Sequence, residues 1–219
     1  MKITLDTNCI IDLEKNRPVA ASLKALIDAS RQGQVELAVA AISASEKMQS
    51  GDYLTNFSEF EERLEQVGLS GARILEPIGI WGVTFWGHFL WSDDSMMGLF
   101  EEIHAILFPN IPFDYEAYSS TRKLPPGNLD PHWRNAICDD LALWCHIYYT
   151  RDAFLTSDAN FHKQSKKPKL VAIGAREILR PEELARRMPT LRKGREQSSI
   201  GAAPKEARIS GKGTPSSSL

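Results

Sequence analysis

Short apolar segments alternate along this chain with segments of helical periodicity, and this alternation restricts the fold more than any other feature. Residues 2–6 form a short apolar segment ending in a carboxylate, and residues 35–42 are almost entirely apolar, as in a strand covered on both faces. Further strands are expected at residues 153–156 and 170–173. Because helical patterns separate these strands, we expect an α/β fold with a central parallel sheet covered by helices.

The expected helices follow from apolar side chains at helical spacing and from residues that begin helices. Pro18 suits the first turn of one helix, where its missing N–H is harmless. Ser43 or Ser45 is expected to cap another helix, whose first turns would contain Glu46. The helices are expected at residues 9–15, 18–33, 57–67, 94–107 and 137–148, and after Pro181.

The stretch from about residue 71 to residue 135 departs from this regular pattern. It contains six prolines, four of the five tryptophans and one expected helix, at residues 94–107. We interpret it as a helical insertion in a single domain that spans residues 1–191. Its tryptophans (Trp81, Trp86, Trp91 and Trp133) are expected in a core or an interface rather than as surfaces for stacking bases. Such an apolar insertion could form a homodimer face.

The last 28 residues, 192–219, differ in composition from the rest of the chain. Six basic and two acidic side chains give them a net charge of +4, whereas the remainder carries −6. Sixteen of these residues are Gly, Ala, Pro, Ser or Thr. The remaining large apolar residues are too few for their burial to offset the entropy cost of ordering the segment. We expect a disordered basic tail, which either contacts nucleic acid weakly or has no specific role.

Nothing in the sequence indicates a membrane protein. The longest apolar run, residues 78–90, is interrupted by glycines and is shorter than the roughly 18 residues of a membrane span. The first residues, MKITLDTN, lack the apolar core of a secretory signal. Cys9, Cys138 and Cys145 are too sparse for a disulfide scaffold and are expected as reduced thiols, so we expect a cytoplasmic protein.

Two carboxylates stand where expected strands end, Asp6 and Asp158. Ligands bind at the carboxyl ends of strands in open α/β sheets, although either acid alone would more often cap a helix. Glu46, Asp139 and Asp140 are the candidates to join them.

The choice between Asp139 and Asp140 depends on helical periodicity. Ala142, Leu143 and His146 lie three, four and seven residues after Asp139, so Asp139 shares a helix stripe with apolar residues. An inward carboxylate is costly unless it is paired or bound to metal. Asp140 lies on a neighbouring stripe, so we favour Asp139 while both stay open.

Clustered carboxylates repel one another, and each rises in pKa unless a cation compensates. Hard oxygen ligands suit Mg²⁺ or Mn²⁺. Two such ions, about 4 Å apart, can activate water and stabilise the leaving oxygen of a phosphodiester. The acids therefore indicate one route to hydrolysis of nucleic acid.

Three segments carry a resemblance to a known family: LDTN at 5–8, SASE at 43–46 and DDLALWCHIYYTRDAFLTSDANF at 139–161. Together they resemble the PIN-domain nucleases, which include the VapC-type toxins of toxin–antitoxin systems, over about residues 1–70 and 136–187. The resemblance implies a Rossmann-type three-layer fold and an Mg²⁺- or Mn²⁺-dependent endoribonuclease that acts on RNA and could pair with an antitoxin protein. It further implies an acidic quartet of Asp6, Glu46, Asp139 and Asp158, with Asn8 and Thr156 orienting these acids or binding phosphate.

Two other functions fit parts of the same pattern. A PIN-like fold could bind RNA or protein without cutting it, although a degenerate site is expected to have lost an acid. A phosphatase of the haloacid dehalogenase type also begins with a strand-end aspartate, but Asn8 stands where it needs a second aspartate.

Two further features lie near the acids in the sequence, a group of lysines and a histidine. Lysines 163, 166, 167 and 169 follow Asp158 closely and could either neutralise phosphates or form a solvated loop. His146 is expected as a structural histidine of the core rather than a metal ligand.

Overall fold

The computed structural model describes residues 1–46, 53–125, 127 and 129–187, of which Met1–Arg186 form one compact unit. The expected tail, residues 192–219, lies outside the described residues, as do the last residues of the expected domain. Within the described part of the chain, no helix combines the length and apolar character that a membrane span requires.

A five-stranded sheet forms the centre of this unit, with the strand order β3-β2-β1-β4-β5. All four pairings are parallel, and Ile3 of β1 lies opposite Leu37 of β2 and Ala153 of β4. This confirms the expected α/β class with a parallel central sheet. The strands are β1 (Lys2–Leu5), β2 (Glu36–Ala40), β3 (Arg73–Leu75), β4 (Ala153–Leu155) and β5 (Glu177–Leu179).

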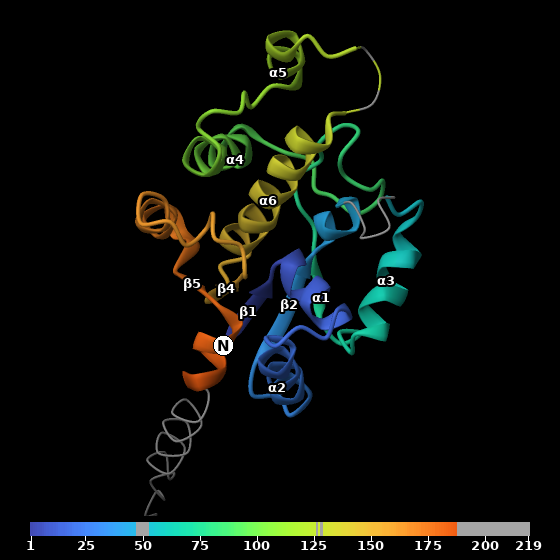
Figure 1. Cartoon of the computed structure of the whole chain (residues 1–219), viewed down its shortest axis with the longest axis vertical. Coiled ribbons are helices and arrows are strands. Elements are labelled where there is room, and N and C mark those ends of the chain that lie inside the picture. The colour runs from blue at the N-terminus through green and yellow to red at the C-terminus, as the bar shows by residue number, and fades with distance from the viewer. Residues whose placement is uncertain (47–52, 126, 128, 188–219) are drawn as a thin grey trace, which may run out of the picture. The chain divides into compact units, whose positions relative to one another are not determined.

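Helices cover the sheet on both sides, as in a Rossmann-like three-layer fold (Figure 1). Phe100 of α4, Leu141 of α6 and Leu170 of α7 belong to one apolar cluster, so these three helices lie over the same face of the sheet. Alternate residues of β2 share a face, and Ala38 and Ala40 join the apolar cluster that contains Leu141 of α6, whereas Val39 between them is buried on the opposite face. The helices are α1 (Thr7–Glu14), α2 (Ala20–Arg31), α3 (Phe57–Gln66), α4 (Asp94–Leu107), α5 (Tyr115–Arg122), α6 (Pro131–Tyr148) and α7 (Lys167–Leu170).

The prediction of a strand at residues 170–173 is wrong. Those residues end α7 and continue into a wider turn, Val171–Ala175, in which Gly174 adopts a φ of 114°. Val171 is 40% exposed, so the run is apolar without being buried on two sides. The true edge strand, β5, is only three residues long, and so short a segment carries no clear periodicity.

The segment interpreted as an insertion is partly integral to the sheet layers. Its beginning contains the edge strand β3 and its end contains the first turn of α6, so residues 76–130 lie between core elements. The expected helix at 94–107 is present as α4, whereas α5 was not expected. Trp144 Nε1 donates to Met96 O at 3.0 Å, which joins α6 to α4.

Of the four tryptophans expected in a core or an interface, one lies in the core, and the interface part of the expectation stays a prediction for the other three. Trp133 is buried at 5% exposure and donates through Nε1 to Pro112 O. Trp81, Trp86 and Trp91 are instead 91%, 76% and 82% exposed. A sequence pattern rich in tryptophan predicts burial only on average, and the loop after β3 turns these three rings outward.

Candidate metal site

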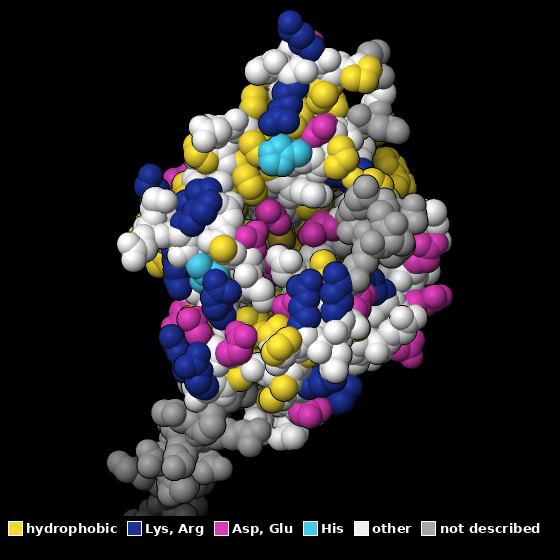
Figure 2. All heavy atoms as spheres, viewed as in Figure 1, with side chains coloured by type: hydrophobic (Ala, Val, Ile, Leu, Met, Phe, Trp, Pro, Cys, Tyr) yellow, Lys and Arg dark blue, Asp and Glu magenta, His cyan; other side chains and the backbone are white. Residues whose placement is uncertain are grey.

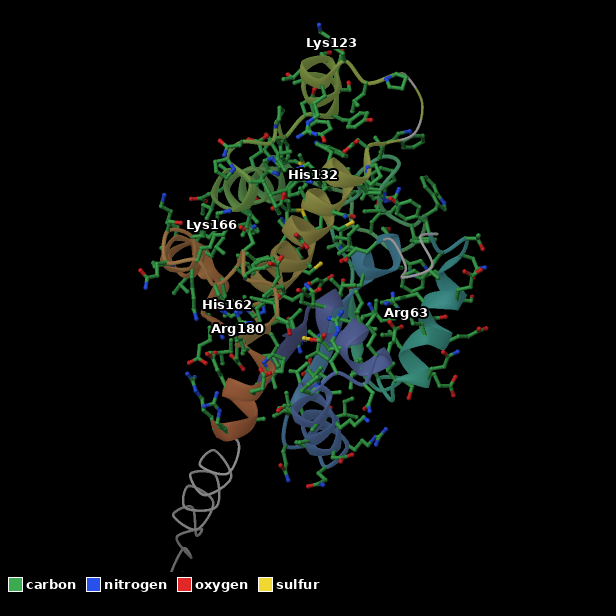
Figure 3. All side chains as sticks on the ribbon, viewed as in Figure 1. Arg63, Lys123, His132, His162, Lys166 and Arg180 are labelled. Carbon is green, nitrogen blue, oxygen red and sulfur yellow. The ribbon has the colours of Figure 1, made fainter. Side chains whose placement is uncertain are left out.

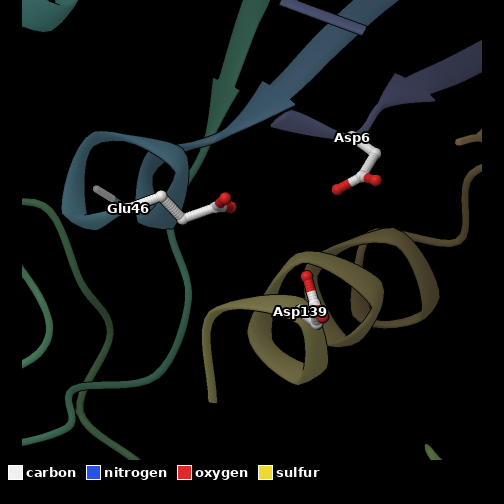
Figure 4. A group of neighbouring side chains, drawn as sticks. All are labelled: Asp6, Glu46 and Asp139. Carbon is white, nitrogen blue, oxygen red and sulfur yellow. The ribbon is translucent and has the colours of Figure 1, made fainter. Parts of the chain in front are cut away.

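Three carboxylates from distant parts of the chain converge at the carboxyl ends of β1 and β2. Asp6 follows β1, Glu46 ends the 3₁₀ turn Ala41–Ser45 that follows β2, and Asp139 projects from the middle of α6 (Figure 4). One oxygen of each lies within 4.8 Å of the other two. In the sheet, β2 lies on one side of β1 and β4 lies on the other. The strand order therefore reverses at β1, and ligands bind at the carboxyl ends of the strands at such a point in open α/β sheets.

Asp6 is oriented by three donors. Its Oδ1 accepts from the backbone N–H of Thr7 at 2.9 Å, which caps α1. Its Oδ2 accepts from Asn8 Nδ2 at 3.0 Å and from Thr156 Oγ1 at 2.6 Å. Both residues that the resemblance named as orienting groups therefore contact the same carboxylate oxygen.

Glu46 is placed by the turn that precedes it rather than by a helix. Ser43 and Ser45 lie within the 3₁₀ turn, and Glu46 has an extended backbone, so the expected helix start at this point is wrong. Thr7 Oγ1 donates to Glu46 and lies 2.7 Å from Ser43 Oγ. The polar network around Ser43 and Thr7 favours a tight turn over a helical continuation.

Thr7 and Arg134 are site residues that the sequence analysis missed. Arg134 of α6 donates through Nε to Ser45 O at 3.0 Å and so holds the backbone next to Glu46. Thr7 stands between the two selected residues Asp6 and Asn8, and this position could have indicated that Thr7 belongs to the site. No local pattern connects Arg134 with Ser45, because they meet only in the folded chain.

Asp139 and Asp140 have different environments although they are neighbours in α6. No donor among the described residues holds Asp139, which points toward Asp6 and Glu46 (Figure 4). Asp140 is fully buried and lies 2.6 Å from His104 Nδ1 of α4, while His104 Nε2 contacts Ile111 O at 2.7 Å. The structure thus brings Asp139 to the acidic group and Asp140 to the α4 contact.

Burial and mutual repulsion raise the pKa values of these carboxylates. Burial raises the pKa of Glu46 to about 8, and the nearby Asp6 carboxylate adds to the rise. Burial also raises the pKa of Asp6, and it raises that of Asp139 well above its ordinary value, with Glu46 as the next contributor. A bound cation would offset this repulsion.

Asp158 lies beside the three acids without joining the group within 4.8 Å. Its backbone N–H donates to Thr156 Oγ1 at 2.9 Å, and its Oδ1 accepts from the N–H of Asn160 at 2.8 Å. Its charge contributes to the raised pKa values of Asp6, Glu46 and Asp139. Of the expected quartet, three acids converge and the fourth stands next to them, linked through Thr156.

The donor set suits a hard divalent cation. All three candidate ligands are carboxylate oxygens, and Asp139 has no competing hydrogen bond from the described residues. Oxygens bound to one Mg²⁺ at about 2.1 Å lie roughly 3–4 Å apart, and the three candidate oxygens lie within 4.8 Å of one another. The buried cluster could therefore hold a metal ion, and its oxygens do not distinguish one hard cation from another.

Basic side chains lie on the same face as the acids. Figure 2 shows acidic side chains gathered in the middle of this face, with lysine, arginine and histidine to either side. Figure 3 labels His162, Lys166 and Arg180 along one side of it. Arg180 Nη1 donates to Ser157 O at 3.2 Å, which places this cation next to the Asp158 turn.

Lys166, from the expected lysine cluster, is engaged in internal contacts. Its Nζ donates to Leu107 O at the end of α4 and to Asn160 Oδ1. Lys163 and Lys169 are exposed, and Lys167 is half-buried. Arg180, which the sequence analysis did not select, is the better placed cation beside Asp158.

The fold and the site together define an α/β protein with a buried carboxylate cluster at the strand ends. No protein-family model matches the chain, and no curated protein shows significant similarity to it. The description of this protein as an α/β protein with a carboxylate cluster therefore rests on its own fold and site.

Proposed function

We propose that this protein is a metal-dependent endoribonuclease with a PIN-like fold, which hydrolyses phosphodiester bonds of RNA. The observation that carries the proposal is the convergence of Asp6, Glu46 and Asp139 within 4.8 Å of one another. The motifs around these residues resemble those of PIN-domain nucleases, and that resemblance supplies the reaction class. Arg180 lies beside the Asp158 turn next to these acids, and a site for a phosphate-containing substrate requires such a cation.

In this proposal Asp6, Glu46 and Asp139 hold Mg²⁺ or Mn²⁺. A divalent cation in such a site stabilises charge on phosphoryl oxygens and lowers the pKa of water. Thr156 and Asn8 keep the Asp6 carboxylate in one orientation through their hydrogen bonds. Thr7 does the same for Glu46.

Asp158 and Arg180 complete the proposed site on its β4 side. The backbone N–H of Asp158 donates to the Thr156 hydroxyl, which in turn donates to Asp6. We therefore assign Asp158 to the surroundings of the reacting phosphate rather than to the three-acid group. Arg180 donates to Ser157 O, and in this proposal its positive charge binds a phosphate of the RNA backbone.

The test is cleavage of a mixed RNA pool by the purified chain. We expect cutting with Mg²⁺ or Mn²⁺, loss of cutting with EDTA, and loss of about a hundredfold or more in Asp6→Asn, which keeps the side-chain size but replaces a charged, accepting oxygen by a donating NH2 group. Asp158→Asn should also lose cutting, while the exposed Glu62→Gln serves as the matched control. Circular dichroism of each variant verifies folding.

Equal cleavage by wild type and Asp6→Asn would overturn the site assignment. Stable RNA binding without cleavage under any divalent metal would favour the second candidate function, a PIN-like module that binds RNA or protein without cutting it. A DNA pool tested in parallel decides the substrate class, since DNA cleavage at equal rates would replace RNA in the proposal.

A toxin role is a narrower form of the same proposal and rests on the resemblance. Expression in a bacterial host should arrest growth in a manner that depends on Asp6, and an antitoxin encoded by an adjacent small gene should relieve it. Growth unaffected by the active protein would count against the toxin role while leaving the nuclease chemistry intact.

A further inference from the structure

An exposed aromatic pocket lies in the segment between β3 and α4. It measures about 540 Å³, and its walls include Trp81, Trp86, Phe89 and Trp91. The three indoles are 91%, 76% and 82% exposed. A folded chain seldom leaves such a continuous aromatic surface in water unless a ligand or partner uses it.

The rings of this tryptophan pocket stand on a well-defined backbone. Gly79 N donates to Leu90 O at 3.0 Å, and Leu90 N donates to Pro77 O at 2.8 Å, which pins the two ends of the segment together. A Cβ on Gly79 would lie only 2.6 Å from the Phe89 ring, so glycine is required there. Phe89 in turn meets both Trp86 and Trp91 edge to face, with centroids 5.6 and 5.4 Å away.

Arg134 connects the tryptophan pocket to the acidic site. Its Nη1 donates to Gly82 O in the wall of the pocket, and its Nε donates to Ser45 O, the residue before Glu46. Its guanidinium also lies 4.4 Å from the centroid of the Tyr53 ring. Arg134 forms no ion pair with a described carboxylate, so its positive charge remains available to an anion between pocket and acids.

We propose that the tryptophan pocket stacks unpaired bases of single-stranded RNA whose phosphates pass Arg134 on the way to the acidic site. The proposal rests on the nuclease function proposed above and names its substrate class. Every base has a π-face, so exposed indoles bind single strands with little sequence preference. Paired bases in a duplex are stacked on one another and are not available to such rings.

The charges around the pocket favour RNA bases over a membrane or an acidic partner. Residues 77–92 contain no Lys, Arg, Asp or Glu, and Asp93 and Asp94 follow them at the start of α4. A surface that binds anionic lipid carries lysines and arginines around its aromatic groups. Here the adjacent acids oppose an anionic surface, whereas neutral bases meet only aromatic rings and the phosphates lie on the Arg134 side.

The test measures the affinity of full-length protein in EDTA for a labelled 12-nucleotide uridine-rich RNA and for a blunt RNA duplex of equal length. Trp81→Ala and Trp91→Ala should each weaken single-strand binding about tenfold, in line with the loss of one stacked base. The half-exposed apolar control Val171→Ala should change neither affinity. All three variants should keep the wild-type melting temperature and its increase on adding Mn²⁺.

The outcomes separate this inference from the nuclease proposal. Wild-type RNA cleavage with unchanged single-strand affinity in both tryptophan variants would overturn the inference alone. Tryptophan-dependent binding of single strands without cleavage under any metal would support the pocket and refute the nuclease.

Three other results would also overturn the inference. One is equal affinity for duplex and single strand. A second is a shift from dimer to monomer on sedimentation of the tryptophan variants, which would assign the pocket to a second copy of the chain. The third is tryptophan-dependent binding to phosphatidylcholine–phosphatidylserine vesicles with unchanged RNA affinity.

Discussion

At the scale of single residues, the fates of Asp139 and Asp140 show how one helical step separates two functions. Successive side chains on a helix differ in direction by about 100°, so neighbouring acids point to different places. Asp139 reaches Asp6 and Glu46 and has no described hydrogen-bond donor, whereas Asp140 is buried against His104. The first carboxylate is suited to a cation and the second to holding α4 against α6.

Substitution of the two neighbours should therefore have opposite consequences. In EDTA, Asp139→Asn should raise the free energy of unfolding by roughly 1–3 kcal/mol, since it removes a half-buried carboxylate that Asp6 and Glu46 repel and that no described donor contacts. It should also abolish the increase in melting temperature on adding Mg²⁺ or Mn²⁺. Asp140→Asn should lower the melting temperature and keep that increase, because it weakens only the His104 contact. Differential scanning fluorimetry measures both quantities.

The exposed Glu62→Gln is the control for these measurements and should behave as wild type. A full cation-induced increase in Asp139→Asn, or its loss in Asp140→Asn, would contradict the assignment of the two acids.

At the scale of elements, α6 joins the site to the rest of the core. Asp139 lies near its middle, and His146 lies two turns further along on the side facing β1. His146 is fully buried, with Nδ1 3.1 Å from Thr4 Oγ1 and Nε2 2.9 Å from Ala175 O. The neutral ring satisfies both contacts by donating to the carbonyl and accepting from the hydroxyl, so His146 is a structural histidine that positions α6.

The buried His146 should make stability depend on pH. Burial lowers its pKa to about 4, below the ordinary value of 6.5, so the folded state binds fewer protons than the unfolded state between these values. Its contribution is fully present above pH 6.5 and is lost as pH falls toward 4. His146→Gln should be less stable than wild type at pH 7, and the difference should shrink by on the order of 1–3 kcal/mol by pH 4.5.

Urea unfolding of both proteins at several pH values measures this difference. Protonation of the acidic site acts equally on wild type and variant and cancels in the comparison. A stability difference that stays constant across this range would show that His146 is not buried in its neutral form.

At the scale of the whole molecule, the distribution of charge matters more than its total. The chain as a whole carries −2, yet one face has a group of acids near its middle with basic side chains above it, to its left and below it (Figure 2). Bound divalent cations would neutralise the acidic centre and leave the surrounding cations to attract phosphates. A near-neutral net charge is thus compatible with a nucleic-acid substrate.

Arg180 provides the test at this scale. If it contacts a phosphate, Arg180→Gln should weaken RNA binding for all sequences and reduce the slope of log affinity against log salt by about one. The exposed Arg31→Gln, which removes a surface pair with Asp28 and a hydrogen bond to Gly68 O, is the matched control. The measurement is RNA binding in EDTA across salt concentrations, and an unchanged slope would exclude Arg180 from the interface.

Much of the architecture could be predicted from the sequence. The strands β1, β2 and β4 and the long helices α4 and α6 all had a clear periodicity or apolar run. The three-residue edge strands β3 and β5 did not, since they have few residues and depend on pairing with a neighbour for their conformation. The run at 170–173 was misread because apolar composition does not reveal whether a segment is buried.

The sequence by itself determined the α/β class and a short set of candidate acids, with Asp139 and Asp140 both open, because local periodicity and strand-end position are properties of short segments. Only the tertiary structure decided that Asp6, Glu46 and Asp139 converge while Asp158 stands beside them. It also decided that Arg134 links Ser45 to Gly82 and that three tryptophans face outward. These features depend on distances between residues far apart in the chain, and such distances arise only when the layers pack together.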